Sequence, residues 1–104
     1  MAKDKIYAVV KHPDERIGHI MEVDNTLKAF QEVVGGRIVQ IPFTPDVVII
    51  CNEEGKLLRL PFNCHFFGDC LVGTIMAVGI RGDDFTDIPI DLSEWEELLT
   101  RWAI

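Results

Sequence analysis

Residues able to bind a metal ion or act as a nucleophile lie close together in residues 61–70, PFNCHFFGDC. This segment holds Cys64, His65 and Cys70, and Cys51 lies a short way upstream. Zinc sites usually draw ligands from tight pairs such as C-x2-C, because that spacing directs two sulfurs at one ion. No such pair is present, and in an extended segment Cys64 and His65 point to opposite faces. We therefore expect no metal site.

The cysteines also lack the pattern of catalytic or disulfide-bonded residues. A catalytic cysteine needs a base within hydrogen-bond reach, and the sequence neighbours of these three do not supply one. An odd number leaves one cysteine over, and a reducing compartment disfavours disulfides. Cys51 ends one apolar segment and Cys70 precedes another, which is typical of small buried residues. We predict no catalytic residue and no cofactor.

Two other histidines lie near the N-terminus, one at the start of the turn HPDER and one shortly after it. His12 and His19 can face each other across a hairpin, although solvated turn histidines explain them equally well. Paired carboxylates occur at 53–54 and 83–84, each beside a glycine in an expected turn, where acids are solvated. We assign a catalytic role to neither pair.

Three polar residues, Asn52, Arg59 and Asn63, are the candidate ligand-binding residues. Asn63 follows Phe62 in the segment LPFN, where it can fix its own loop or present its amide to a ligand. A pocket between a sheet and helices, with these side chains at its rim, would bind a small molecule. This is our alternative functional hypothesis.

The elements that must position these residues begin with a hairpin formed by strands over 5–10 and 17–23. A helix follows over 24–36, with Asp24 or Asn25 at its start and Gly35-Gly36 at its end. We expect four further strands, over residues 37–41, 47–51, 56–60 and 71–80. The run VVIIC at 47–51 is apolar without alternation, which indicates a strand covered on both faces. Its expected hairpin partner is the strand at 56–60.

The last element is a helix over 91–104. Ser93 and Glu96 have the spacing of a capping box. Its apolar face repeats at helical spacing and comprises Trp95, Leu98, Leu99 and Trp102. Together these elements predict an α+β single domain spanning residues 1–104. We expect a mixed or mostly antiparallel sheet with an N-terminal hairpin and two helices packed on one side.

Composition narrows the function classes. The net charge is −7, from 10 basic and 17 acidic residues, which argues against direct nucleic-acid binding because that requires a basic surface. An acidic chain favours solubility and would also suit a basic partner protein. No apolar run is long enough to span a membrane, and the N-terminus lacks the pattern of a signal peptide. We expect a cytoplasmic protein, and exposed sheet edges make a homodimer plausible.

Three segments carry a resemblance to a known family: VDNTLKAFQEVVGG, VVIICNEEGKLLRLPFN and LVGTIMAVG. In order and spacing they resemble the family called domain of unknown function 3846, over roughly residues 6–90. The family's pattern usually continues past Asn63 with a basic residue, where this chain has Cys64. This difference argues against a shared anion site and against a family catalytic cysteine. The resemblance implies an accessory protein of a phage or integrated mobile element, and brings no activity with it.

The leading hypothesis is therefore a non-enzymatic protein-interaction module. It would bind an unidentified host or element protein, and inhibition of host defence is one role that such binding could serve. The acidic charge and the lack of a catalytic motif are its support in the sequence. Acidic residues gather at 83–87 and 91–97, which permits DNA mimicry without demonstrating it.

Overall fold

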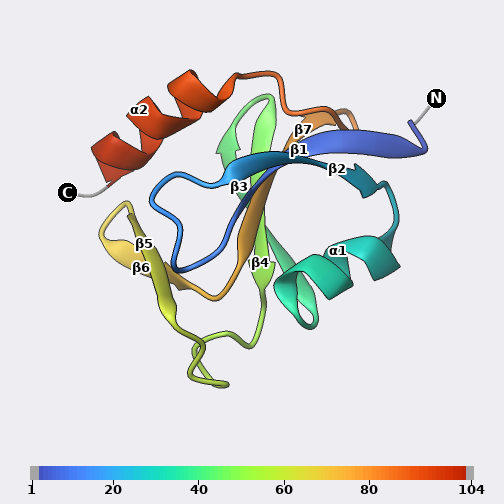
Figure 1. Ribbon diagram of the computed structural model, residues 1–104. Coiled ribbons are helices and arrows are strands. Elements are labelled where there is room, and N and C mark those ends of the chain that lie inside the picture. The colour runs from blue at the N-terminus through green and yellow to red at the C-terminus, as the bar shows by residue number, and fades with distance from the viewer. Residues whose placement is uncertain (1–2, 103–104) are drawn as a thin grey trace.

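The computed structural model describes residues 3–102, which form eight strands and two helices (Figure 1). Chain order is ββαββββββα. The elements are β1 (Lys5–Lys11), β2 (His19–Asp24), α1 (Leu27–Val34), β3 (Ile38–Thr44), β4 (Val47–Asn52), β5 (Phe62–Phe66), β6 (Asp69–Val72), β7 (Ile75–Arg81), β8 (Asp84–Thr86) and α2 (Leu92–Trp102). Within these residues, no helix combines the length and the apolar character that crossing a membrane requires.

The strands form two antiparallel sheets. The main sheet has the order β2-β1-β7-β4-β3, and β8 also pairs with β7. The smaller sheet is the hairpin of β5 and β6. Every strand pair is antiparallel, so the predicted α+β class and the N-terminal hairpin are confirmed.

The two helices cover opposite faces of the main sheet (Figure 1), so their predicted placement on one side is wrong. Alternate residues of β4 show the division: Val48 and Ile50 pack in the cluster with α1, whereas Ile49 and Cys51 pack in the cluster with α2. All six residues of β4 are buried, as the run without alternation predicted. Helix α1 covers one face of β4, and α2 together with the β5–β6 hairpin covers the other.

The β4–β5 connection differs from the predicted hairpin of 47–51 with 56–60. Residues 53–59 form a series of turns, and β4 pairs instead with β3 and β7. Arg59 has a φ of 57°, which is incompatible with a strand. The apolar run at 71–80 is likewise divided between β6 and β7, because Gly73 turns the chain with a φ of 73°.

Both helices begin at a cap one or two residues from the predicted one. Thr26, not Asp24 or Asn25, caps α1 by accepting from the amide of Ala29 at 3.1 Å. In α2 the Asp91 carboxylate accepts from the amide of Glu94 at 2.8 Å, so the capping residue is Asp91 and not Ser93.

The apolar face of α2 is anchored by Trp95. Its side chain is fully buried, and its indole N–H donates to the carbonyl of Ile17 at 2.8 Å. Leu98 and Leu99 pack against the same cluster, whereas the side chain of Trp102 and residues 103–104 lie outside the described part of the chain. Trp95 thereby connects α2 to the β1–β2 loop.

Candidate metal centre and apolar surface

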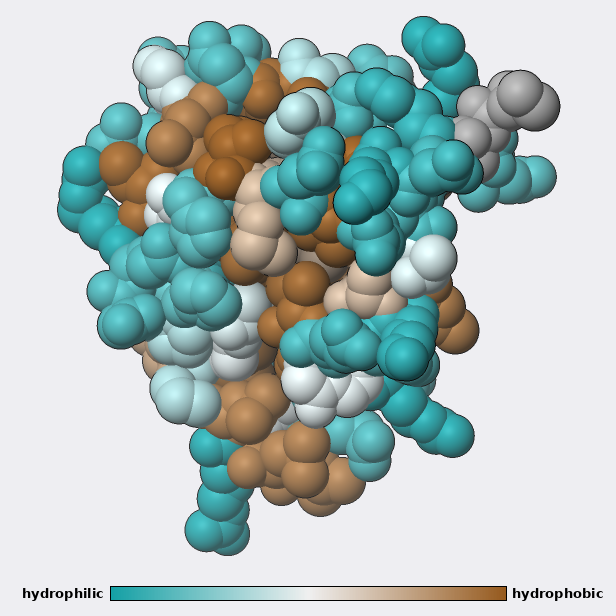
Figure 2. Space-filling view, turned by 45° about the vertical axis from the view of Figure 1, so that its right-hand side comes forward, coloured by the Kyte–Doolittle hydropathy of each residue, from teal (hydrophilic) through white to brown (hydrophobic). Residues whose placement is uncertain are grey.

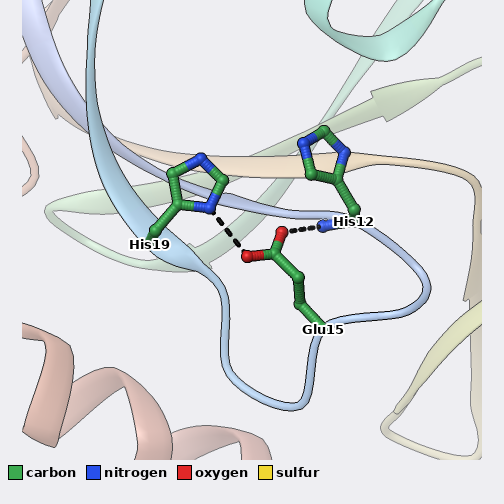
Figure 3. A group of neighbouring side chains, drawn as sticks. All are labelled: His12, Glu15 and His19. Carbon is green, nitrogen blue, oxygen red and sulfur yellow. Dashed lines mark hydrogen bonds and ion pairs between the residues drawn. The ribbon is translucent and has the colours of Figure 1, made fainter.

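The β1–β2 loop brings His12, Glu15 and His19 together (Figure 3). One ligand atom from each lies within 4.8 Å of the other two. The Glu15 carboxylate accepts from the backbone amide of His12 and is bonded to the Nδ1 of His19, both at 2.8 Å. The two imidazole rings stand 5.7 Å apart between their centroids.

Backbone geometry places His19 at this position. In the β1–β2 pair, His19 lies opposite Val10, so the chain must reverse within the residues between them. Gly18 completes the reversal with a φ of 101°, a conformation that favours glycine. A Cβ at Gly18 would also lie 2.6 Å from the carbonyl oxygen of Val10. Glycine is therefore required where the loop enters β2.

His12 is oriented by a different part of the chain. Its Nδ1 lies 2.8 Å from the Oγ1 of Thr74, in the short connection between β6 and β7. Because Nδ1 makes this bond, Nε2 is the ring nitrogen of His12 that can bind an ion. The backbone amide of His12, with the ring of His19, holds the pKa of the Glu15 carboxyl below its usual value. A carboxylate and two imidazoles are thus poised on one side of the loop.

The sequence left open whether His12 and His19 face each other or are solvated turn residues, and it gave no role to Glu15. The signal available was the spacing H-x2-E-x3-H, which reads as an ordinary polar turn. The three side chains come together only in the folded hairpin, where the pairing of β1 with β2 brings His19 back toward His12.

The predicted ligand-binding residues do not converge on one site. Asn52 is buried at the end of β4, where its amide donates to the carbonyl of Val34 at 3.3 Å and its Oδ1 accepts from the amide of Glu54 at 2.8 Å. Arg59 is exposed on the β4–β5 turns. Asn63 is buried in β5. Their role in ligand binding remains a prediction.

A groove of about 190 Å3 lies between the β4–β5 turns and β6. Of the three candidates, Asn52 lines the groove and the other two do not. Its walls also include Ile41, Leu57 and Leu71, and no residue of either helix. This groove is therefore not the expected pocket between sheet and helices.

Leu57, at the wall of this groove, is one of several large apolar side chains that the chain exposes. The described residues include eight large hydrophobic side chains that are exposed, and four fall between residues 57 and 67. We call these four the 57–67 surface: Leu57, Leu58, Phe62 and Phe67. Figure 2 shows a hydrophobic patch at the bottom of the molecule, at the level of the β4–β5 connection in Figure 1.

Comparison with known protein families shows which family the chain belongs to. The model of the family described as a domain of unknown function, DUF3846, matches residues 6–102. The chain belongs to this family. No curated protein and no solved structure matches it. The predicted resemblance is confirmed, and the match extends through α2.

The cysteines of this DUF3846 domain are free thiols. Cys51 is buried, and Cys64 and Cys70 are half-buried. Burial raises the pKa of Cys64 to about 11, an effect that the neighbouring Lys11 ammonium only partly opposes. Burial also raises the pKa of Cys51. A nucleophilic cysteine needs the opposite shift, so these two thiols have the character of core residues.

Proposed function

We propose that this DUF3846 domain is a non-enzymatic protein-interaction module of a phage or integrated mobile element. The observation that carries the proposal is the 57–67 surface. Exposed apolar patches commonly mark a contact site for another protein, and Figure 2 shows such a patch at the level of the β4–β5 connection. Interference with a host defence protein is one role that such a contact would serve.

The 57–67 surface is held in a defined shape. The turns that carry Leu57 and Leu58 are closed by backbone hydrogen bonds from Leu58 to Glu54 and from Leu60 to Gly55, at 2.9 and 3.0 Å. Leu57 is 78% exposed in this arrangement. A turn that fixes an apolar side chain in water loses little further conformational entropy when a partner covers it.

The hairpin of β5 and β6 presents the rest of this surface. The rings of Phe62 and His65 lie 5.0 Å apart at a tilted angle, and those of Phe67 and Phe43 lie 6.0 Å apart, measured between centroids. Both exposed phenylalanines are thus oriented by ring contacts. Aromatic anchors of this kind supply much of the binding energy in protein interfaces.

The partner that fits is a protein with an apolar contact site set in a basic surface. The chain carries a net charge of −7, which attracts a basic partner over about the last nanometre before contact. Beside the 57–67 surface, Glu53 and Glu54 add exposed carboxylates. The apolar side chains would supply affinity, and the charge would supply the rate of association.

The test is an affinity capture from lysate of a bacterium that carries this gene, with and without nuclease. The bait proteins are the wild type, the double variant Leu57→Ser/Leu58→Ser and the control Leu27→Ser. Leu27 is 58% exposed, close to the 55% of Leu58, and lies on α1, outside the 57–67 surface. The proposal expects one basic protein to be bound by the wild type and the control, and at least tenfold less by the double variant.

Other outcomes contradict the proposal in distinct ways. Equal capture by all three baits would show that the 57–67 surface is not the contact. Capture lost on nuclease treatment would show a contact through nucleic acid. If no protein is captured and the double variant alone changes the mass of the purified protein from dimer to monomer, the partner is a second copy of this chain.

Small-molecule binding is the alternative, supported by Asn52 at the wall of the groove. Its volume of about 190 Å3 is below the ~300 Å3 at which drug-sized ligand pockets begin. The amide of Asn52 is also engaged by Val34 and Glu54. These observations favour protein interaction over ligand binding.

A further inference from the structure

We propose that His12, Glu15 and His19 form a binding site for one divalent transition-metal ion, and that Zn2+ is an ion this donor set binds. The inference is independent of the proposed function, since these residues are separate from the 57–67 surface. It follows from the convergence of three ligating side chains on one loop (Figure 3).

The donor set matches the coordination chemistry of zinc. Two imidazole nitrogens and one carboxylate oxygen are the protein ligands of many zinc sites, and the same set binds other divalent first-row metals. At Zn–N and Zn–O distances of about 2.0–2.2 Å, ligand atoms on one ion lie roughly 3–4 Å apart. The ligand atoms here lie within 4.8 Å of one another, so small side-chain rotations bring them onto one ion.

The surroundings of His12 resemble those of a metal-bound histidine. Such histidines usually bond their second ring nitrogen to a polar group outside the site, which fixes the ring orientation and the tautomer. The Nδ1 of His12 is bonded to the Oγ1 of Thr74, so that its Nε2 serves as the ligand. Thr74 is therefore a positioning residue for the site.

Glu15 is fixed in a similar way. One carboxylate oxygen accepts from the backbone amide of His12, and the other lies 2.8 Å from the Nδ1 of His19. The carboxylate is thus anchored at one oxygen and directed toward the histidines by the other. An ion would exchange the Glu15–His19 hydrogen bond for two bonds to the metal, with any proton on the ligating nitrogen released to solvent.

The hydrogen bond between Glu15 and His19 does not account for the position of the His12 ring. His12 makes no side-chain contact with the Glu15 carboxylate among the hydrogen bonds that residues 3–102 form, yet its ring faces the same space. With their ring centroids 5.7 Å apart, the two imidazoles are close enough for one cation to bind a nitrogen of each. His12 is also exposed, so an ion can reach the site from solvent.

Three protein ligands leave a coordination position open. Structural zinc sites usually have four protein ligands, and sites with three bind water or an external group in the fourth position. The ion would clamp the loop between β1 and β2 and could accept a donor atom from solvent or from a bound molecule.

The test is calorimetric titration of the full chain, stripped with EDTA and kept reduced, with Zn2+ alone. We expect one ion per chain. His12→Gln, Glu15→Gln and His19→Gln should each weaken affinity at least tenfold, and Thr74→Val severalfold. The control is His65→Gln, which removes an exposed histidine on β5 and should leave affinity unchanged.

Two further measurements exclude binding by the thiols and loss of the fold. Co2+ bound at this site should lack the near-ultraviolet charge-transfer band of thiolate ligands. The metal-free variants should unfold at the wild-type temperature within a few degrees, and Zn2+ should raise that temperature more for the wild type and His65→Gln than for the three ligand variants.

Besides retained binding in the ligand variants, three results would each overturn the proposal. They are no measurable Zn2+ binding, a thiolate band with Co2+, and affinity that falls equally in His65→Gln and in the three ligand variants. Retained tight binding in all three ligand variants would do the same, because no other residue set is proposed to bind the ion.

Discussion

The Lys11 ammonium donates a hydrogen bond to the Oδ1 of Asn63 at 2.8 Å, and both side chains are buried. The Asn63 amide in turn donates to the carbonyl oxygens of Lys11 and Gly73, at 2.8 and 2.7 Å. These bonds join β5 of the small sheet to β1 of the main sheet. Among residues 3–102, no carboxylate lies within ion-pair distance of Lys11, so Asn63 is its principal partner.

Replacing Asn63 by alanine should therefore destabilise the fold strongly. The change leaves a buried ammonium and two buried carbonyls without the amide, and we expect a loss of about 3 kcal/mol in the free energy of unfolding. Urea unfolding measures it. Asn25→Ala is the control, because that half-buried amide also donates to two carbonyls, those of Lys3 and Phe85. It should cost about 1 kcal/mol. Equal losses would mean that burial of Lys11 adds nothing.

We expect the free energy of unfolding to fall at alkaline pH because of the Cys64 thiol. Burial raises its pKa from 9.0 to about 11, so between these values the unfolded chain releases the proton and the folded chain retains it. Stability due to this group is complete below pH 9 and is lost as the pH rises toward 11. Because the thiol is only half-buried, we expect a loss of about 1 kcal/mol, less than the full shift implies.

The measurement is urea unfolding of the wild type and Cys64→Ala from pH 8 to pH 11, under reducing conditions. The difference in unfolding free energy between the two proteins should shrink across this range. Comparison with the variant largely cancels the other titrating groups except Lys11, whose charge interacts with Cys64. A difference that does not vary with pH would show that Cys64 does not titrate differently in the folded and unfolded chains.

The sequence and the structure assign the cap of α2 to different residues, Ser93 and Asp91, and this difference can be tested. Asp91 accepts from the amide of Glu94, whereas Ser93 is exposed within the first turn. Asp91→Ala should cost about 1 kcal/mol of unfolding free energy, and Ser93→Ala close to none. Thermal unfolding of the two variants distinguishes them. A larger effect at Ser93 would restore the capping box expected from the sequence.

Much of the fold could be predicted because its signals are local. Periodicity and turn residues located the N-terminal hairpin, the helix ending at Gly35 and the doubly buried strand at 47–51. The placement of the helices could not be read from either helix alone. Burial on both faces of 47–51 already required cover on both sides, and this constraint would have separated the helices.

The site residues were less predictable because their contacts span long sequence distances. Lys11 looks like a solvated residue at a strand end, and it is buried because a partner 52 positions away covers it. The same holds for His12, whose orientation depends on Thr74, 62 positions further on. For Glu15 the distance is short, but convergence depends on the left-handed backbone of Gly18. Spacing alone contains none of this information.

Gly18 tests whether the loop geometry matters to both stability and metal binding. Gly18→Ala introduces a Cβ 2.6 Å from the carbonyl oxygen of Val10 at a φ of 101°. Gly35 is the matched control, since its φ is 80° and a Cβ there meets nothing within 4 Å. We expect Gly35→Ala to cost about 1 kcal/mol and Gly18→Ala about 3 kcal/mol in urea unfolding, because only the latter forces the backbone to move.

The backbone shift at Gly18 should also displace His19, which follows directly in β2. The affinity for Zn2+ should therefore fall in Gly18→Ala at temperatures where the variant is still folded, and should not change in Gly35→Ala. Measuring both variants separates a general loss of stability from a local loss of geometry. If Gly18→Ala retained the wild-type affinity, His19 would not need the register that places it opposite Val10.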